Sequence, residues 1–271
     1  MSLPRPTRAV VTGAGSGLGR ALCEELGARG ARVLASDIDE AAARATAAAC
    51  RAEAVRCDVS RLADVEALAD EADRRLGGVD LVVNNAGVAT VGRVGDVPIA
   101  DWEWLIGVNL WGVVHGCHAF VPRLRARRAG HILNVASCAG LAYLPFMAPY
   151  NASKAAVVAL SETLRLELEG DGVGVTVLCP TFFKTSIIES ARGDGRGRDI
   201  ARRAIDAAKM SARDVARVAL DAVDRNELHV VPMADGRWIW RARRAFPRGY
   251  LRVVKKVLAR WARREGMELG L

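Results

Sequence analysis

The sequence lacks long hydrophobic runs, a secretory leader and paired cysteines. No apolar run approaches the roughly 18 to 20 residues that a membrane-spanning helix needs. The N-terminal segment has no signal-peptide hydrophobic region before the first strand-like segment, which predicts a cytoplasmic protein. The 6 cysteines are scattered without a CxxC pair, and this favours reduced, mostly buried thiols over a disulfide framework or a zinc site.

Residues 1–235 also lack net charge. The formal charge of +8 gathers at the C-terminal end, because residues 236–271 hold eleven Arg and Lys against two Glu, a net +9, which leaves about −1 for the rest. This distribution argues against a nucleic-acid-binding body. At 271 residues the chain is long enough for one large α/β domain.

A glycine-rich turn follows the first strand-like segment. Residues 8–12 are rich in β-branched side chains, TGAGSGLG occupies residues 12–19, and an amphipathic helix is expected after it. This order is typical of a dinucleotide-binding unit, although glycines also occur in ordinary turns. Gly13 permits the tight turn, Gly17 lets backbone approach a pyrophosphate, and Gly19 allows close helix packing.

Asp37 follows the next predicted strand, at the distance past the glycines where a carboxylate meets the adenosine ribose. Its charge would repel a 2′-phosphate, and Ser16 leaves no basic residue in the glycine loop to offset that repulsion. The sequence therefore predicts NAD rather than NADP as cofactor, with a solvated turn aspartate as the alternative.

Strand-like and helix-like segments then alternate, with helices expected over residues 39–51 and 62–76 and a buried strand over 81–83. This rhythm predicts an α/β fold, a Rossmann-like doubly wound parallel sheet with helices on both faces. We expect one domain over residues 1–235 and a C-terminal helical extension over 236–271.

Ser137, Tyr150 and Lys154 lie within one short stretch. Tyr150 and Lys154 are four residues apart, so on a helix they share a face. A neighbouring ammonium favours a phenolate, so we expect Lys154 to lower the pKa of Tyr150. Ser137 can then donate a hydrogen bond to a substrate oxygen. By itself, the same spacing is also typical of a solvated helix face.

Together these motifs resemble the short-chain dehydrogenase/reductase family. The resemblance spans residues 8 to about 235 and rests on motifs that occur in order and at compatible spacing. They are TGAGSGLG at 12–19, Asp37, the DV pair at 58–59, NNAG at 84–87, Asn109, Ser137, YNASK at 150–154, and Pro180 with Thr185.

The resemblance implies a catalytic tetrad of Asn109, Ser137, Tyr150 and Lys154 that transfers hydride between NAD and an alcohol or carbonyl compound. Tyr150 is the implied general acid or base, and Asn109 helps hold a water that connects Lys154 to solvent. The implied cofactor contacts are Gly13, Ser16, Gly17, Leu18, Gly19, Asp37, Ile38, Asp58, Val59, Asn84, Asn85, Ala86, Gly87, Tyr150, Lys154, Pro180, Thr181, Phe183 and Thr185. The family commonly has Pro-Gly where this chain has Pro180-Thr181, so the local backbone path is expected to differ.

Two segments are expected to set substrate specificity. Residues 139–147 supply an apolar wall suited to a lipid-like or ring-containing alcohol, formed by Leu141, Tyr143, Leu144, Phe146 and Met147. Residues 186–210 contain a polar, glycine-containing run that predicts a mobile lid. Its arginines, Arg192, Arg196 and Arg198, either meet an anionic tail of the substrate or form a solvated lid surface.

Residues 101–128 predict one long helix with an apolar stripe through Trp104, Leu105, Val108, Trp111 and Val114. We expect this stripe to pack in the core or against another subunit, since the family often pairs this helix and the one after Tyr150 in homodimers or homotetramers. His115, Cys117 and His118 cluster nearby without further ligands at suitable spacing, so no metal site is expected. Cys138, next to Ser137, is interpreted as a packed thiol.

The extension predicts a basic amphipathic helix preceded by Trp238 and Trp240. One face carries Tyr250, Leu251, Val253, Val254, Val257, Leu258 and Trp261, and the other carries Arg252, Lys255, Lys256, Arg260, Arg263 and Arg264. Such a helix fits peripheral attachment to an anionic membrane. Alternatively, its apolar face packs on the parent subunit or a neighbour, or roofs the substrate pocket.

Two functions are therefore open. The first is an NAD-dependent dehydrogenase or ketoreductase for a hydrophobic small-molecule substrate, and the second is a nucleotide sensor or scaffold that uses the basic tail to engage a membrane or partner. The tetrad favours the enzyme, because a sensor has no need of a tuned phenol. Nucleic acid is not expected as a partner.

Overall fold

The computed structural model describes residues 3–264, except for the side chains of residues 196, 257, 258 and 261–264. A parallel sheet of 7 strands forms its centre, in the order β3-β2-β1-β4-β6-β7-β9. Its strands are β1 (Arg8–Thr12), β2 (Arg32–Asp37), β3 (Glu53–Arg56), β4 (Leu81–Asn84), β6 (Gly130–Val135), β7 (Val173–Leu178) and β9 (His229–Val230).

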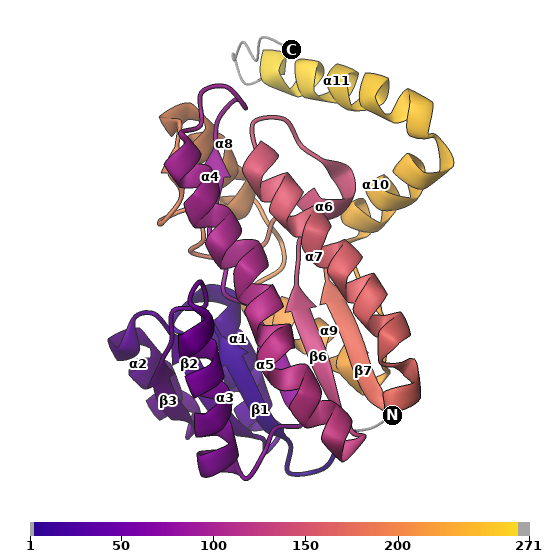
Figure 1. Cartoon of the computed structure of the whole chain (residues 1–271). Coiled ribbons are helices and arrows are strands. Elements are labelled where there is room, and N and C mark those ends of the chain that lie inside the picture. The colour runs from indigo at the N-terminus through magenta and orange to yellow at the C-terminus, as the bar shows by residue number, and fades with distance from the viewer. Residues whose placement is uncertain (1–2, 265–271) are drawn as a thin grey trace.

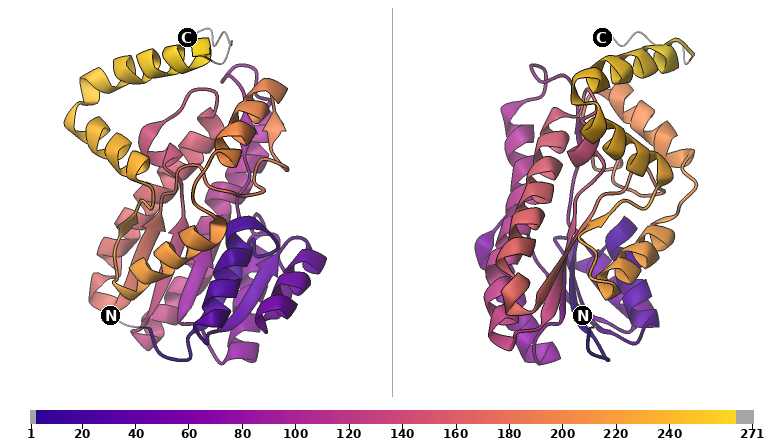
Figure 2. Two further views of the ribbon diagram at one scale, coloured as in Figure 1. Left: turned by 180° about the vertical axis from the view of Figure 1, so that it is seen from behind. Right: turned by 90° about the vertical axis from the view of Figure 1, so that its right-hand side faces the viewer.

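Helices cover both faces of this sheet (Figures 1 and 2). One face carries α3 (Leu62–Leu76), α5 (Gly112–Arg127) and α7 (Ala148–Glu167), and the other carries α1 (Gly17–Ala28), α2 (Glu40–Cys50) and α9 (Ala212–Asp224). The strand order changes direction between β1 and β4, so their carboxyl ends flank a crevice where ligands bind in this architecture. The expected doubly wound α/β fold is confirmed.

Local sequence explains these elements. In α3 the buried residues recur at helical spacing (Val65, Leu68, Ala69, Ala72 and Leu76), and Gly77 ends the helix with φ of 75°. The strands β4 and β6 are buried on both faces, as parallel strands between two helical layers must be.

The helix predicted over residues 101–128 is longer and is interrupted. It consists of α4 (Ile99–Ile106), a π-helical turn η1 (Gly107–Trp111) and α5. By length and hydropathy the run Ile99–Arg127 could cross a membrane, but 44% of its most apolar window is buried inside the fold. Its α5 part packs on α3 and on the sheet, which accounts for its apolar character.

The segment expected as a mobile lid is built from regular elements. Within it, β8 (Arg192–Gly193) pairs with β5 (Thr90–Val91), and α8 (Gly195–Asp206) follows. Residues 139–147 contain a short helix, α6 (Ala139–Ala142). A one-turn 3-10 helix, η2 (Glu169–Asp171), precedes β7.

The C-terminal extension begins with α10 (Ala234–Ala245), which lies against the body beside α6, and continues as α11 (Pro247–Arg264) (Figure 1). Trp240 of α10 packs on the core and against His229, at 5.1 Å between ring centroids, whereas Trp238 is exposed. Tyr250 is buried, and its hydroxyl donates to the carbonyl of Ala142 at 2.7 Å. The predicted contacts of Val257, Leu258, Trp261, Arg263 and Arg264 lie outside the described side chains.

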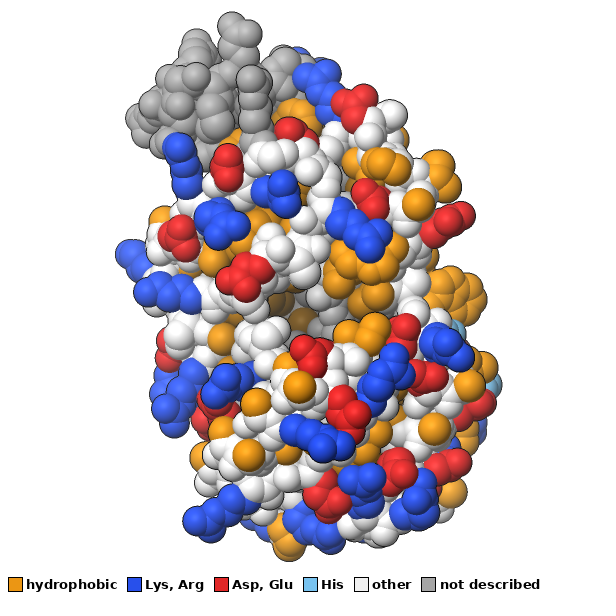
Figure 3. Space-filling model, turned by 90° about the vertical axis from the view of Figure 1, so that its left-hand side faces the viewer, with side chains coloured by type: hydrophobic (Ala, Val, Ile, Leu, Met, Phe, Trp, Pro, Cys, Tyr) orange, Lys and Arg blue, Asp and Glu red, His pale blue; other side chains and the backbone are white. Residues whose placement is uncertain are grey.

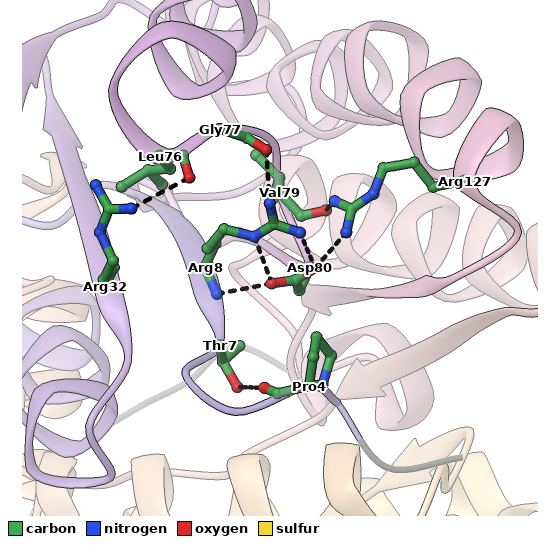
Figure 4. Close-up of polar contacts among 9 residues, drawn as sticks. All are labelled: Pro4, Thr7, Arg8, Arg32, Leu76, Gly77, Val79, Asp80 and Arg127. Carbon is green, nitrogen blue, oxygen red and sulfur yellow. Dashed lines mark hydrogen bonds and ion pairs between the residues drawn. The ribbon is translucent and has the colours of Figure 1, made fainter.

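An ion-pair network lies at the end of the sheet where its strands begin (Figure 4). The buried carboxylate of Asp80 accepts hydrogen bonds from Arg8 Nε at 2.8 Å and from Arg127 at 2.9 Å. Burial alone raises the pKa of Asp80, but the bonds from Arg8 and Arg127 outweigh burial and hold that pKa below its usual value. The network stabilises the end of the sheet opposite the candidate site.

Candidate active site

A cavity of about 690 Å³ opens at the carboxyl ends of the strands. Figure 3 shows a hollow near the middle of one face of the molecule, with hydrophobic side chains inside it. Every predicted cofactor-binding residue except Asn84 lines the cavity, and so do Ser137, Tyr150 and Lys154. The structure therefore brings together residues from positions 13 to 185.

The glycine turn forms one end of this cavity. Gly13 and Gly17 adopt left-handed backbone with φ of 63° and 49°. A Cβ at Gly17 would lie 2.9 Å from Thr185 Oγ1, and a Cβ at Gly19 would overlap the carbonyl oxygen of Gly13. The three glycines leave backbone N–H groups uncovered at the N-terminus of α1, which is the arrangement that binds a pyrophosphate.

Asp37 ends β2 beside this turn. Its Oδ2 accepts the N–H of Gly15 at 2.8 Å, and its Oδ1 accepts the N–H of Asp39 at 3.0 Å. Both bonds fix the carboxylate at the cavity wall, where it can accept bonds from ribose hydroxyls.

Asn84 and Asn85 point in opposite directions. The amide of Asn84 is buried beneath α5 and donates to Asn134 Oδ1 at 2.8 Å, away from the cavity. Asn85 donates to the carbonyl of Thr12 at 2.8 Å and lines the cavity. Asn84 therefore does not line the cavity, because successive side chains at a strand end alternate between its two faces, and its contact with the cofactor stays a prediction.

Tyr150 and Lys154 lie on α7, and Ser137 follows β6. Lys154 is 2% exposed, and its Nζ donates to the carbonyl of Val135 at 2.8 Å and lies 5.7 Å from the centre of the Tyr150 ring. The Ser137 hydroxyl oxygen accepts the N–H of Ala139 at 3.1 Å. The Ser137 hydroxyl donates to the carbonyl of Pro180 at 3.4 Å.

The pKa values in this cluster differ from the sequence prediction. Burial raises the pKa of Tyr150 above its usual value, and the hydrogen bond with Ser137 lowers it only in part. Burial lowers the pKa of Lys154 to about 8. The expected lowering of the Tyr150 pKa by Lys154 is therefore wrong for the chain itself, because desolvation is the larger effect.

Asn109 lies in the π-helical turn and does not line the cavity. Its Oδ1 accepts the N–H of Val88 at 2.8 Å, and its Nδ2 donates to the carbonyl of Val88 at 2.9 Å. Asn109 Oδ1 and Lys154 Nζ both lie within 3.5 Å of the point that a Cβ of Gly87 would occupy. Asn109 thus fixes the backbone beside Lys154 from behind the cavity wall.

The predicted apolar wall over residues 139–147 is only partly correct. Leu144 and Met147 line the cavity, whereas Leu141 packs in the core. Tyr143 is exposed beneath Arg243, whose guanidinium lies 3.8 Å from the ring centre. Much of the wall comes instead from α4, β5 and the segment after Thr185: Val91, Trp104, Ile187, Ile188, Ala201 and Ile205.

Trp104 was expected to pack in the core or at an interface, but it lines the cavity. The Arg192 guanidinium stacks 3.9 Å from the centre of a Trp104 ring and pairs with Asp101 at 3.1 Å. Arg198 donates to the carbonyl of Ala191 at 3.4 Å, and the side chain of Arg196 lies outside the described residues. Arg192 therefore has partners within the chain, and neither it nor Arg198 lines the cavity.

The cysteines are unpaired, and all but Cys50 are buried. Cys138 lines the cavity beside Ser137, but burial raises its pKa to about 11, so its thiol stays protonated at neutral pH. His115 contacts the carbonyl of Val59 at 2.9 Å. Within residues 3–264, no three His, Cys, Asp or Glu side chains gather as metal ligands.

Two further cavity residues come from α10. Asp235 and Ile239 lie one turn apart in α10 and line the cavity from the start of the C-terminal extension. In the sequence, only their four-residue spacing indicates that they share a helix face. That spacing does not show what the face packs against. The extension thus contributes to the site.

Comparison with known proteins places these features in context. The sequence profile of the short chain dehydrogenase family matches residues 7–195. The chain is 42% identical over 195 residues to "Probable oxidoreductase EphD" of Mycobacterium tuberculosis, a match that covers 70% of this chain but only 33% of that protein. The chain therefore corresponds to about a third of that relative.

Other relatives match over more of their length. The 1-deoxy-11-beta-hydroxypentalenate dehydrogenase of Streptomyces exfoliatus is 39% identical over 213 residues, which cover 74% of this chain and 77% of that one. A short chain dehydrogenase/reductase from Burkholderia phymatum, crystallised in complex with NAD, superposes with a TM-score of 0.86 at 36% identity. That superposition covers 91% of this chain and 95% of the other.

Proposed function

The chain belongs to the short chain dehydrogenase family, and from that premise we propose that it transfers hydride between NAD(H) and a hydrophobic alcohol or its carbonyl counterpart. The observation that carries this proposal is the position of Tyr150, Ser137 and Lys154 in one cavity, between a glycine cradle and an apolar chamber.

The cradle fits a dinucleotide. Gly13, Gly17 and Gly19 present uncovered backbone where a Cβ would collide, and Asp37 supplies a carboxylate at the ribose position. Asp37 also favours NAD over NADP, because its charge opposes a 2′-phosphate. The likeness to a structure solved with NAD supports the same choice.

The residues of the chain divide the proton chemistry among them. In the oxidative direction a bound NAD would supply the acceptor for the hydride of the substrate carbon. Tyr150 as phenolate accepts the hydroxyl proton, and Ser137 donates a hydrogen bond to the developing carbonyl oxygen. A buried phenolate needs a nearby cation, and among the described lining residues Lys154 is the single basic one. Asn109 holds the adjoining backbone rather than touching the substrate.

The substrate chamber is apolar, which favours a lipid-like, terpenoid or steroid-like alcohol. The likeness to a hydroxypentalenate dehydrogenase supports a ring-containing alcohol. We expect an intracellular enzyme.

The test is NAD-linked oxidation of a panel of long-chain, terpenoid and steroid alcohols, and reduction of their ketones, by the purified protein. Turnover abolished in Tyr150→Phe, with NADH affinity unchanged, supports the proposal. Tyr143→Phe is the matched control, because it removes the hydroxyl of an exposed tyrosine that does not line the cavity. Tight NADH binding with no turnover of any alcohol or ketone would favour the nucleotide-sensor alternative.

We also propose that the chain forms a homodimer or homotetramer through α4–α5 and α7. Trp111 and Leu166 support this, because they are 53% and 75% exposed on these helices. Light scattering should give a multiple of the 29.0 kDa chain mass, reduced in Trp111→Glu. A monomeric wild-type protein would contradict the assignment.

The extension offers a further contact, with an anionic membrane surface. Leu251 and Val253 of α11, and Phe246 just before it, are more than half exposed. Arg252, Lys255 and Lys256 are exposed on α11 as well. Exposed apolar side chains flanked by cations fit a lipid interface. Tyr250 instead faces the body, so part of the apolar face packs on the parent chain.

Flotation with vesicles of anionic and of neutral lipid tests this contact. A truncation after Ala245 retains α10, and we expect it to lose binding to the anionic vesicles. Val94→Glu, a substitution at an exposed apolar position in the loop before α4, should leave binding unchanged. Equal flotation of full-length and truncated protein would remove the membrane contact and leave packing as the role of α11.

A further inference from the structure

The first turn of α10 lies against the loop that follows Ser137. A Cβ at Gly236 would lie 2.8 Å from Thr181 Cγ2 and 3.5 Å from Cys138 Sγ, so the helix start touches both the residue after Ser137 and the segment after β7. A larger residue at this position would require the Thr181 or Val231 side chain to shift. It fixes Asp235 next to the reacting end of the cavity.

The carboxylate of Asp235 has acceptor capacity to spare. Its Oδ1 accepts the N–H of Gly236 at 2.8 Å and the hydroxyl of Thr181 at 3.3 Å. Its Oδ2 has only a 3.5 Å contact with the same hydroxyl. Within the described residues, no Arg or Lys pairs with Asp235, and its side chain is exposed at the cavity. An ionised carboxylate offers about four acceptor sites, so at least one remains open.

The position of this charge in the cavity is unusual. Three other charged side chains line it: Asp37 and Asp58 at the ends of β2 and β3, and Lys154 beneath Tyr150. Apolar side chains, among them Ile239, Phe182 and Ala142, also line the cavity. A ligand group that covers this exposed carboxylate without donating a hydrogen bond to it displaces its water and leaves it without a partner, and this mismatch costs binding free energy.

We infer that Asp235 determines specificity by accepting a hydrogen bond from a second donor group of the substrate, a hydroxyl or an ammonium, held in the same chamber as the reacting alcohol. This inference rests on the proposed function and narrows its substrate class. A substrate with an apolar group at that point loses the bond, and one with a carboxylate meets charge repulsion. Thr181 positions Asp235 through its hydroxyl.

A matched set of trans-4-substituted cyclohexanols tests the inference. The substituent is methyl, hydroxyl, amino or carboxylate, and the ring holds it at a fixed distance from the reacting hydroxyl. We expect the wild-type protein bound to NADH to bind the hydroxyl and amino compounds about ten-fold or more tightly than the methyl compound, and the carboxylate most weakly. The kcat/KM values for NAD-linked oxidation should follow the same order.

The variants separate the charge from the fold. In Asp235→Asn the preference for the amino compound should disappear and the carboxylate should gain affinity, while in Asp235→Leu the methyl compound should bind best. Asp96→Asn removes an exposed acid that does not line the cavity and should change nothing. Unchanged NADH affinity verifies that each variant is folded, and a reversal of ligand order is a result that a purely structural role would not produce.

Equal affinities for the four compounds in the wild-type protein, including no detectable binding of any, would overturn the inference. The same would follow if Asp235→Asn kept the wild-type order. Binding to the NADH complex needs no turnover. If the four compounds bind in the expected order of affinity but no alcohol is oxidised, the oxidoreductase proposal is contradicted and the role of Asp235 is supported. If the alcohol panel is oxidised but the four compounds bind equally, the oxidoreductase proposal is supported and the role of Asp235 is contradicted.

Discussion

The side-chain amide of Asn109 forms two hydrogen bonds with the backbone of Val88. Its Oδ1 accepts the N–H of Val88 at 2.8 Å, and its Nδ2 donates to the carbonyl of Val88 at 2.9 Å. Asn109 is fully buried, so no water is at hand to replace these bonds. The π-helical turn aims the amide at the chain that follows NNAG. In this way one side chain ties the helix layer to the cavity wall.

Replacing Asn109 with Ala should reduce the free energy of unfolding by about 2 to 4 kcal/mol, because two buried backbone groups lose their partners. Urea denaturation measures the change. Glu66→Ala, at an exposed position of α3, should stay within about 0.5 kcal/mol of the wild-type protein. An effect of Asn109→Ala as small as that of Glu66→Ala would show that Val88 finds other partners.

Replacing Lys154 with Met should separate stability from activity. Burial lowers the pKa of Lys154 to about 8 from an unfolded value near 10.5, so the folded protein binds fewer protons than the unfolded one between those two pH values. The folded state therefore bears a penalty of up to about 3 kcal/mol below pH 8, which is relieved as pH rises towards 10.5.

Lys154→Met removes this penalty, at the loss of one hydrogen bond to Val135. At pH 7 the variant should be at least as stable as the wild-type protein, yet inactive. Urea denaturation from pH 7 to pH 10 measures the difference between the two proteins, which should shrink as pH rises. A difference that stays constant with pH would contradict the lowered pKa.

Replacing Asp37 with Ser should weaken NAD binding and reduce the discrimination against NADP. The carboxylate both accepts ribose bonds and repels a 2′-phosphate, so its loss should change the ratio of the two dissociation constants by about ten-fold or more. Asp39→Ser is the control, since it removes a neighbouring charge but keeps a residue suited to cap α2. Tighter binding of NADP than NAD by the wild-type protein would contradict the assigned role of Asp37.

Replacing Gly19 with Ala should impair both folding and NADH binding. The added Cβ would overlap the carbonyl of Gly13 and come within 2.6 Å of the Asn85 amide, and neither can retreat without moving the cradle. Gly170→Ala is the matched control, because no atom lies within 4 Å of its added Cβ and its φ is not positive. Thermal unfolding and NADH fluorescence measure both effects, and two variants that behave alike would rule out a special role for Gly19.

Replacing Asp80 with Asn should cost about 3 kcal/mol at pH 7, because Arg8 and Arg127 lose a buried anionic partner. The folded pKa of Asp80 is lowered, so its contribution is fully present above the unfolded pKa and is lost as pH falls through the folded value. The difference between variant and wild type in urea denaturation should therefore shrink towards pH 2. Asp70→Asn, in an exposed ion pair with Arg123, should cost no more than about 1 kcal/mol.

The sequence by itself determined the sheet and helix order and most of the cofactor cradle. These depend on patterns within a few residues of each other: the glycines at 13, 17 and 19, the carboxylate that ends β2, and the four-residue spacing of Tyr150 and Lys154 on α7. Local periodicity and backbone freedom encode such features directly.

Only the tertiary structure decided which way neighbouring side chains face and which distant segments meet. Asn84 lies in the core, whereas Asn85 lines the cavity. Trp104 lines the cavity and stacks against Arg192. The first turn of α10, which contains Asp235, packs against Cys138. The Tyr150 pKa likewise rose rather than fell, because burial is a property of the packed fold. Contacts across 50 or more residues leave no periodic signal in the sequence, so packing alone sets them.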